Sequence, residues 1–365
     1  MGLFSPLAMT QALPFLPLAQ GDIDYQVSKR AQPGLIEEVL QDPNTKVMLV
    51  SDGLIAIPKD PAGLRQHSGA PMRLATIPGN YAVHDVLNHR EVLPIFLGSY
   101  GPESNEYAVA VDISRISVDP RGNTRGVLPD AANTGADAAL DESMPANKAS
   151  LSIFAHAKQQ YDWVDLRTFA PHASARQVGQ ATTAIALSNW HTAQRYCPTC
   201  GSRVESVLSG WAQRCTNESD GNRLLFPRVE PAVIVAIVDG EDRLLMQHNR
   251  AWNDASLFSV TAGFVEAGEN LEHACRREAM EETGIRLGEV KYLGSQPWPF
   301  PASLMMAFKA QALSTEIHAD GDETTDVRWM SREQLTHALI AGEMSLPGKA
   351  SIARHMIQEW YGQEI

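Results

Sequence analysis

Apolar and polar positions form their clearest pattern in the C-terminal third of the chain. The run VIVAIV, within Ala232–Val238, is bounded by Pro231 and by Asp239-Gly240, which predicts a buried strand. Arg243–Gln247 is expected to pair with it across the turn that follows. Further strands are predicted at Leu257–Thr261, Val290–Gly294 and Leu304–Ala310, and a helix at Arg332–Ala341. Together these elements predict a mixed sheet between helices.

The first half of the chain predicts a different domain. Short strands are expected at Val47–Val50, Leu54–Pro58, Val92–Leu97 and Tyr107–Asp112, which favour a mixed α/β domain with an antiparallel sheet. From about 119 to 150, Gly and Pro are spread among Ala, Asn and Asp, which is typical of a loop or insertion. A helical pattern then runs from about Ala173 to Arg195, where His191 is interpreted as a packed or capping residue.

These patterns divide the chain of 365 residues into three parts. Residues 1–172 form an N-terminal mixed α/β domain with a flexible insertion near 119–150. Residues 173–230 form a linker helix and a ribbon-like segment. Residues 231–365 form the C-terminal domain.

Composition limits the classes of partner. The net charge of −13 disfavours broad contact with nucleic-acid phosphates, although a local basic cleft is compatible with it. The first twenty residues lack a positive region typical of a signal peptide, and no run is apolar enough to cross a bilayer. We therefore expect a cytoplasmic protein without a membrane partner.

The strongest chemical signal is the stretch GFVEAGENLEHACRREAMEETGI, from Gly263 to Ile285. Glu278, Glu281 and Glu282 are three and four residues apart, so a helix places them on one face. Like charges at this spacing weaken a helix unless a cation binds between them. Oxygen ligands of this kind suit Mg²⁺ or Mn²⁺. The alternative is a solvated acidic face.

The flanking residues argue against a merely solvated face. Gly263 and Gly268 enclose a loop, Glu269 follows it, Arg277 precedes Glu278, and Gly284 ends the helix. The stretch fits G-x5-E-x7-R-E-U-x-E-E-x-G-U, where U is an apolar residue, and this pattern is the Nudix box. We expect Glu269 and Arg277 to pair and to hold the loop against the helix.

A second signal is a cysteine knuckle before this domain. Cys197 and Cys200 lie on one tight turn of the type that binds zinc, and Cys215 would add a third thiolate. No fourth cysteine follows, so Asp220, Glu218 or a water would complete the site. A ribbon without metal is the alternative, and a redox role is disfavoured because no thioredoxin-like unit surrounds the pair.

A third signal is Ser295-Gln-Pro-Trp-Pro-Phe-Pro-Ala-Ser303. Alternate prolines predict an extended, rigid loop, and Trp298 and Phe300 offer faces that stack on a base or a nicotinamide ring. The alternative is a stiff connector with aromatic residues in the core.

The Nudix box followed by SQPWPFPxS resembles the NADH pyrophosphatase subfamily of Nudix hydrolases, as does the cysteine ribbon before it. The resemblance is specific over about 190–353. It implies a Nudix fold preceded by a zinc-ribbon-like knuckle and an N-terminal mixed α/β domain. It also implies a homodimer.

The resemblance further implies roles for individual residues. Two or three Mg²⁺ or Mn²⁺ ions would be held by box glutamates, by the carbonyl of Ala262 and by Glu323. Gly263 and Gly284 would be structural. The implied substrate contacts are Phe226, which stands where relatives often have tyrosine, Phe264, Ala353, and the run Gln296, Pro297, Trp298, Pro299, Phe300, Pro301, Ala302 and Ser303.

The implied activity is hydrolysis of the diphosphate of NADH or NAD⁺ to NMN(H) and AMP, with Glu278 or Glu282 as general base. Removal of the NAD cap from RNA would use the same chemistry. Two alternatives stay open: a broader Nudix hydrolase acting on ADP-ribose or diadenosine polyphosphates, and a non-catalytic NAD-binding protein. The latter is disfavoured because the box keeps all its glutamates.

Overall fold

The computed structural model describes residues 7, 12–13, 16–19, 21–60, 69–101, 106–118, 124–125 and 153–365. The chain divides into two compact units. Gln20–Pro227 form one, called here the amino unit, and Met1–Ala19 with Arg228–Ile365 form the other, called the carboxyl unit. The predicted insertion at 119–150 lies outside the described residues, apart from 124–125.

The amino unit is built on a seven-stranded mixed sheet with the order β1-β5-β6-β2-β3-β9 and with β4 beside β2. Its strands are β1 Ile23–Asp24, β2 Lys46–Ser51, β3 Leu54–Pro58, β4 Thr76–Pro78, β5 Leu93–Tyr100, β6 Glu106–Asp112 and β9 Tyr161–Val164. Antiparallel pairing predominates, as predicted, but β2 and β6 are parallel. A separate short pair joins β7 Ser117–Val118 and β8 Thr124–Arg125.

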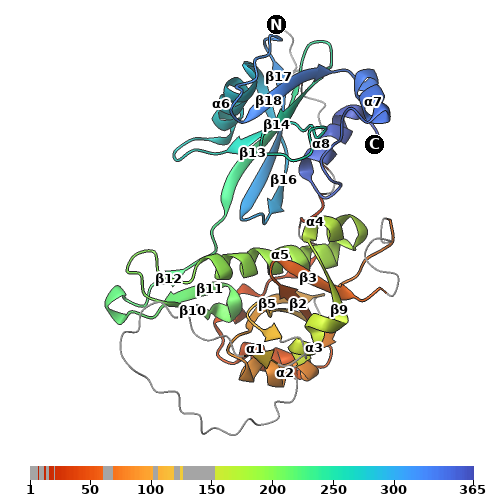
Figure 1. Ribbon diagram of the computed structural model, residues 1–365. Coiled ribbons are helices and arrows are strands. Elements are labelled where there is room, and N and C mark those ends of the chain that lie inside the picture. Colours follow the sequence, from red (N-terminus) through yellow and green to blue (C-terminus); the bar gives the residue numbers. More distant parts are fainter. Residues whose placement is uncertain are drawn as a thin grey trace. The chain divides into compact units, whose positions relative to one another are not determined.

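Helices cover both faces of this sheet. Figure 1 shows α1, α2 and α3 on one side and α5 on the other. The helices are α1 Leu35–Gln41, α2 Gly79–Asn88, α3 Ile153–Gln160, α4 Leu166–Phe169 and α5 Ala175–Ala193. The apolar faces of α1, α2 and α3 pack on β2, β5 and β6 through Val39, Val86, Phe154 and Phe96. The long predicted helix is therefore confirmed as α5.

The ribbon-like segment completes the amino unit. It is a three-stranded antiparallel sheet of β10 Val204–Val207, β11 Ala212–Cys215 and β12 Leu224–Leu225. The indole of Trp211, just before β11, donates to the main-chain oxygen of Phe96 in β5. This contact ties the ribbon to the sheet of the same unit.

The carboxyl unit has a six-stranded sheet in the order β16-β17-β13-β14-β18, with β15 beside β13. Its elements are β13 Glu230–Val238, β14 Leu244–Asn249, β15 Thr261–Phe264, α6 Leu271–Thr283, β16 Leu287–Trp298, β17 Ser303–Ala312, β18 Thr324–Met330, α7 Arg332–Ala341 and α8 Ile352–Tyr361. The predicted mixed sheet is confirmed, because β13 is parallel to β17 and antiparallel to β14 and β15.

The period-two alternation of β13 creates two cores. Val233, Val235 and Ile237 pack with residues of α6. Ile234, Ala236 and Val238 share the opposite core with α7 and α8, where Trp360 is buried. The sheet therefore lies between helices, and α6 is held firmly on one face.

Two leucines from the described part of the N-terminal segment join this second core. Leu16 packs in it and Leu13 borders it. The main-chain N–H of Leu13 donates to the oxygen of Leu293 in β16, at 2.9 Å. The Lys291 ammonium donates to the oxygen of Leu7, at 2.8 Å. Sequence patterns predicted no structure for this segment.

Two predicted elements differ in the structure. The strand expected at Leu257–Thr261 begins only at Thr261, since Leu257 and Ser259 form isolated bridges. The proline-rich stretch is not an extended loop but the corner of a hairpin, because β16 continues to Trp298, which pairs with Ser303 at the start of β17. Pro297 is accommodated in this strand pair opposite Leu304.

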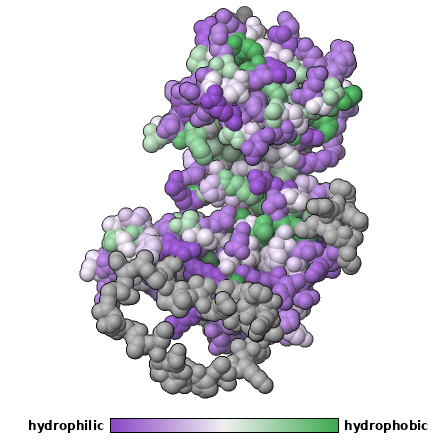
Figure 2. Space-filling view, in the orientation of Figure 1, coloured by the Kyte–Doolittle hydropathy of each residue, from purple (hydrophilic) through white to green (hydrophobic). Residues whose placement is uncertain are grey.

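On the face shown in Figure 2, hydrophilic residues dominate the surface of both units and apolar residues are scattered among them. None of the helices in the described ranges combines the length and the hydropathy needed to span a bilayer.

Candidate active site

The glutamate helix is α6, and local signals set both its ends. The side chain of Asn270 accepts the N–H of His273 and caps the start of the helix. Gly284 ends it with φ 72°, a left-handed conformation that favours glycine. Ala274, Cys275 and Ala279 face the core. Glu278, Glu281 and Glu282 share one face of the helix, as predicted, and Glu278 and Glu282 are buried beside these core residues.

Arg277 braces the loop that leads into the helix. Its guanidinium donates to both oxygens of Glu269, with Nε–Oε1 at 2.9 Å and Nη2–Oε2 at 2.7 Å. These bonds, with a smaller contribution from His273, lower the pKa of Glu269 to about 2. Arg277 also donates to the main-chain oxygen of Phe264 at 2.8 Å. The predicted pairing of Glu269 with Arg277 is confirmed.

Glu278 lies directly against the first glycine of the box. A Cβ atom built on Gly263 would be 2.0 Å from the Glu278 carboxyl, so a larger residue at this position would displace that carboxyl. Burial raises the pKa of Glu278, and the Arg277 guanidinium, 2.8 Å from Oε1, opposes that rise. Glu281, whose side chain is 60% exposed, accepts from the same Arg277 nitrogen at 3.0 Å.

Glu282 is the most deeply buried carboxylate of the helix, with 3% of its surface exposed. The Gln247 amide donates to its Oε2 at 2.9 Å, and the Thr261 hydroxyl donates to the Gln247 oxygen at 2.8 Å. Burial raises the pKa of Glu282 to about 7, although the Gln247 bond lowers it, and Glu278 and Glu323 add to the rise. Sequence reasoning missed this relay, since Gln247 and Thr261 belong to no motif.

A cavity of about 600 Å³ opens beside these carboxylates. It brings together nine of the predicted residues: Ala262, Gly263, Phe264, Arg277, Glu278, Glu281, Glu282, Ser303 and Glu323. It is also lined by residues that were not predicted: Ala232, Glu266, Met305, Asp320 and Asp322. The residues come from β13, β15, α6, β17 and the loop before β18, so the sheet topology gathers distant segments at one place.

The loop that carries Glu323 is organised by Asp320. One carboxylate oxygen of Asp320 accepts the main-chain N–H groups of Asp322, Glu323 and Thr324, at 3.0, 3.2 and 2.9 Å. The N–H of Arg250 donates to the Glu323 oxygen at 2.8 Å. The Glu323 side chain itself is exposed at the cavity. Asp320 therefore acts as a positioning residue that the sequence pattern did not single out.

Other predicted substrate residues do not line this cavity. Gln296 has no exposed surface, because its amide donates to the oxygens of Pro17 and Ala350 and its oxygen accepts the N–H of Ile352 at 2.8 Å. Ala353 is buried in the core of α8. Gln296 and Ala353 are therefore buried away from this cavity, and their contact with substrate stays a prediction. Phe226 is exposed and belongs to the amino unit.

The hairpin corner from Pro297 to Ala302 lies outside the cavity lining as well. Trp298 and Phe300 are half-buried and pack edge to face, with ring centroids 5.0 Å apart. Pro299 is buried, whereas Pro301 is exposed. The corner leads into β17, whose first residue, Ser303, is in the cavity.

The donor set fits hard divalent cations. Glu278, Glu281, Glu282 and Glu323 offer only oxygen atoms, which Mg²⁺ and Mn²⁺ prefer. The charges of Glu281 and Glu323 add to the rise in the pKa of Glu278, and those of Glu278 and Glu323 add to the rise in the pKa of Glu282, so the ionised cluster is unfavourable by itself. A divalent cation between these side chains would remove that repulsion.

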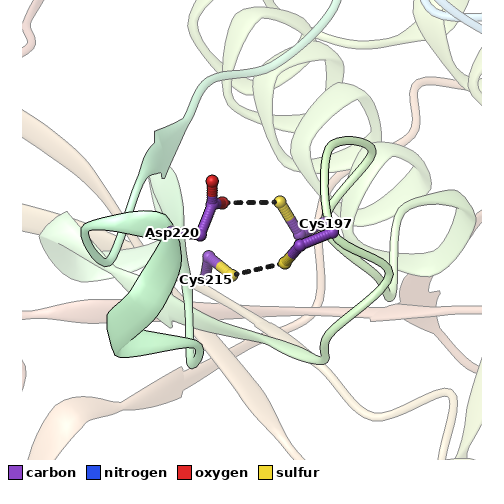
Figure 3. A group of neighbouring side chains, drawn as sticks. Cys197, Cys215 and Asp220 are labelled. Carbon is purple, nitrogen blue, oxygen red and sulfur yellow. Dashed lines mark hydrogen bonds between the residues drawn. The ribbon is translucent and has the colours of Figure 1, made fainter.

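The cysteine knuckle forms a second metal-type cluster (Figure 3). One ligand atom each from Cys197, Cys200, Cys215 and Asp220 lie within 4.8 Å of one another. Figure 3 labels Cys197, Cys215 and Asp220 of this cluster. The Cys200 and Cys215 sulfurs are 3.5 Å apart, and the Cys197 sulfur is 3.3 Å from an Asp220 oxygen. A tetrahedral zinc with bonds of about 2.3 Å has edges of about 3.8 Å, so the four groups fit it.

Asp220, rather than Glu218, is the carboxylate in this cluster. The Arg223 guanidinium donates to the second Asp220 oxygen at 3.2 Å and lowers the pKa of that carboxyl. Gly201, with φ 72°, forms the tight turn between the first two cysteines and the strand that follows. The three thiolates and one carboxylate would hold a structural zinc that stabilises the ribbon.

We expect Asp220→Ala to lower zinc affinity about a hundredfold, because one of four ligands is lost. Glu218→Ala, which changes the neighbouring carboxylate outside the cluster, should leave affinity unchanged. Zinc content by mass spectrometry and release to a chromogenic chelator would measure both. Equal zinc retention in the two variants would contradict the Cys₃Asp assignment.

Comparison with known proteins agrees with this geometry. The NUDIX domain family matches residues 228–349, and the NADH pyrophosphatase zinc ribbon domain matches residues 193–224. The NAD-capped RNA hydrolase NudC of Mycobacterium bovis is 38% identical over 224 residues, which cover 59% of this chain and 70% of that protein. The human NAD-capped RNA hydrolase NUDT12 is 36% identical over 195 residues, covering 51% of this chain and 42% of that protein.

Among solved structures, a NUDIX hydrolase from Nitrosomonas europaea covers 47% of this chain and 95% of its own, with 19% identity and a TM-score of 0.37. The sequence matches are much stronger. The chain belongs to the Nudix hydrolase superfamily. Within it, the zinc ribbon and the NudC and NUDT12 relatives place the chain in the NADH pyrophosphatase subfamily, as the box and the proline-rich stretch predicted.

Proposed function

We propose that this protein hydrolyses the diphosphate of NADH or NAD⁺ to NMN(H) and AMP with the aid of Mg²⁺ or Mn²⁺. The observation that carries the proposal is the convergence of Glu278, Glu281, Glu282 and Glu323 in one cavity with Ser303 of the proline-rich hairpin. Phe264, which is 55% exposed at the same cavity, offers an aromatic face for a nicotinamide or adenine ring.

In this reaction the oxygen of a water forms a bond to one phosphorus of the diphosphate, and the bridging P–O bond breaks. One phosphate leaves as part of NMN(H) and the other as part of AMP, while the proton of the water passes to a carboxylate or to solvent. When bound, divalent cations supply charge neutralisation at the diphosphate and a lowered pKa for the attacking water. Glu278, Glu281, Glu282, Glu323 and the Ala262 carbonyl would hold them.

The protein's own residues orient this chemistry. Glu278 and Glu282 are the two candidates for general base, since both carboxyls are buried with raised pKa values. Gln247 and Thr261 hold Glu282 from behind, and Arg277 holds Glu278 and Glu281. The carboxylates are thus fixed before substrate arrives, which lowers the cost of ordering them in the transition state.

Removal of the NAD cap from RNA is a second activity of the same site. It is favoured because relatives that are 38% and 36% identical carry the name NAD-capped RNA hydrolase. The same phosphorus–oxygen bond is broken. The difference is that the RNA chain continues from the 3′ oxygen of the AMP ribose. The homodimer and the cytoplasmic location remain predictions, and light scattering of the purified protein would check the first.

Product analysis with Mn²⁺ would test the proposal. We expect AMP release from NADH with a kcat/KM at least about tenfold above that for ADP-ribose or diadenosine polyphosphates. Those two substrates lack the nicotinamide ring, so they lose its contacts with the pocket. A short 5′ NAD-capped RNA in the same panel should yield a 5′-monophosphate end. Preference for ADP-ribose would support the broader Nudix alternative, and no turnover of any dinucleotide would support a binding protein.

A further inference from the structure

A second large cleft lies within the amino unit, and nothing described above uses it. Its volume is about 710 Å³, within the usual range for small-molecule sites. It is lined by the segment before β5, the turn after β6, the end of α5, and the ribbon strands β10 and β11. Figure 1 labels these strands and α5 within the amino unit. We call it the arginine cleft, after Arg90, Arg115, Arg195 and Arg203 in its lining.

The four arginines bring positive charge to the cleft, whereas the whole chain has a net charge of −13. Arg90 and Arg115 form no ion pair or side-chain hydrogen bond with any residue in the described ranges. The Arg203 guanidinium lies 5.5 Å from the centre of the Tyr196 ring. Guanidinium groups that lack a carboxylate partner are suited to bidentate contacts with phosphate.

The floor of the cleft is a fixed hydrogen-bond system. His191 Nε2 donates to the Gly210 oxygen at 2.9 Å, which leaves Nδ1 as an acceptor. The Gln213 amide nitrogen donates to that Nδ1 at 3.1 Å and to the Gln194 oxygen at 2.8 Å. Burial lowers the pKa of His191, in keeping with a neutral ring. Both partners of the Gln213 nitrogen are acceptors, so the amide orientation is determined.

One polar atom of this floor lacks a partner. Gln213 is 3% exposed, and its side-chain oxygen receives no hydrogen bond from the described residues. A buried acceptor without a donor is costly, which points to a donor supplied from the cleft. The Gln213 oxygen without a donor and the arginines Arg90 and Arg115 without a carboxylate partner are independent observations, and both point to a ligand in this cleft.

Acidic residues in the lining limit the kinds of ligand that the arginine cleft can bind. Asp112 is occupied, because its two oxygens accept from Ser114 and Ser188. Glu91 and Glu205 also line the cleft, and Glu205 is exposed. A bare anion would be repelled by these two carboxylates. A ligand that has a phosphate at one end and hydroxyl or amino donors at the other would use arginines, carboxylates and the Gln213 oxygen together.

We propose that the arginine cleft binds a nucleoside monophosphate, with its phosphate at Arg90 and Arg115 and its hydroxyl or amino groups toward Glu205 and Gln213. The site lies wholly in the amino unit, and the catalytic cavity lies wholly in the carboxyl unit. The proposal does not depend on which dinucleotide the enzyme hydrolyses.

Calorimetry with the full-length protein and AMP, without added divalent cations, would test this site. We expect Arg90→Ala/Arg115→Ala to weaken AMP binding by about tenfold or more, because charged hydrogen bonds to phosphate are lost. Arg73→Ala, at an exposed arginine of the same unit outside the cleft lining, is the matched control and should bind AMP normally. All three positions are exposed, and a thermal melt would verify folding.

Inorganic phosphate and adenosine complete the experiment. Both should bind more weakly than AMP, since each engages only part of the lining. Phosphate that binds as tightly as AMP would overturn the nucleotide assignment. Absence of AMP binding, or binding that survives in the double variant, would overturn the site itself. Hydrolysis of NADH by the double variant at the normal rate would show that the lost binding belongs to the cleft and not to the catalytic cavity.

Discussion

Glu282→Gln should abolish hydrolysis of NADH and, at the same time, stabilise the metal-free protein. The buried Glu282 carboxyl has its pKa raised to about 7, against an ordinary value of 4.5. The folded protein therefore holds this proton more tightly than the unfolded chain does. Stability falls as pH rises between these two values, and above pH 7 the full cost of about 3 kcal/mol is present. Glutamine removes that cost while it keeps an oxygen for Gln247.

Thermal melts at pH 8 and pH 6, with and without Mn²⁺, would measure the effect. Without the cation, the variant should melt higher than the wild type, and by more at pH 8 than at pH 6. With the cation the order should reverse, because only the wild type gains fully from binding. Glu281→Gln, at an exposed glutamate of the same helix, is the control and should melt close to the wild type when no cation is present. A variant that hydrolyses NADH normally would contradict the metal assignment.

The second large effect is expected for Arg277→Met. Five hydrogen bonds of this guanidinium hold Glu269, Glu278, Glu281 and the Phe264 carbonyl. Its removal leaves the largely buried carboxylates of Glu269 and Glu278 without their cation. We expect the melting temperature to fall by roughly 5–10 °C. The turnover number should fall too, since Glu278 and Glu281 lose the group that orients them.

The neighbouring Arg276 supplies the control. Within the part of the chain that the structure describes, its side chain donates only to main-chain oxygens, those of Glu272 and Gly288, at 2.7 and 2.8 Å. Arg276→Met changes the same charge and volume on the same helix but leaves the carboxylate cluster paired. Circular dichroism melts and steady-state kinetics of both variants would compare them. Equal losses of melting temperature in Arg277→Met and Arg276→Met would indicate that the charge of the helix determines stability. The hydrogen bonds from Arg277 to the carboxylates would then not be the cause.

The parts of the active site that sequence predicted are those that lie close together along the chain. Glu278, Glu281 and Glu282 are specified by helical period, and Glu269 with Arg277 by a single loop that closes on the helix. Such local geometry depends on few residues, so spacing alone determines it. Glu323 and Ser303 were named only through the family resemblance, and the sheet topology brings them to the same cavity.

The parts that sequence did not predict depend on pairing between distant segments. Gln247 and Thr261 meet Glu282 only because β14 and β15 lie beside α6 and β13. Gln296, predicted to touch substrate, is instead turned into the core by hydrogen bonds to Pro17, Ala350 and Ile352. Neither segment 16–19 nor 350–352 carries a pattern that signals this contact. The sequence of one strand does not show which of its faces will be covered, because that depends on which distant segments pack against it.

The same contact at Gln296 has a consequence for how the molecule is made. Leu16 is synthesised before the amino unit, yet its packing partners in β13, β16 and α8 emerge from the ribosome only after the entire amino unit. The amino unit can therefore fold cotranslationally, whereas the catalytic half must wait for release of its last helix before its core closes. Until then the amide of Gln296 and the side chain of Leu16 lack their partners and are open to chaperones.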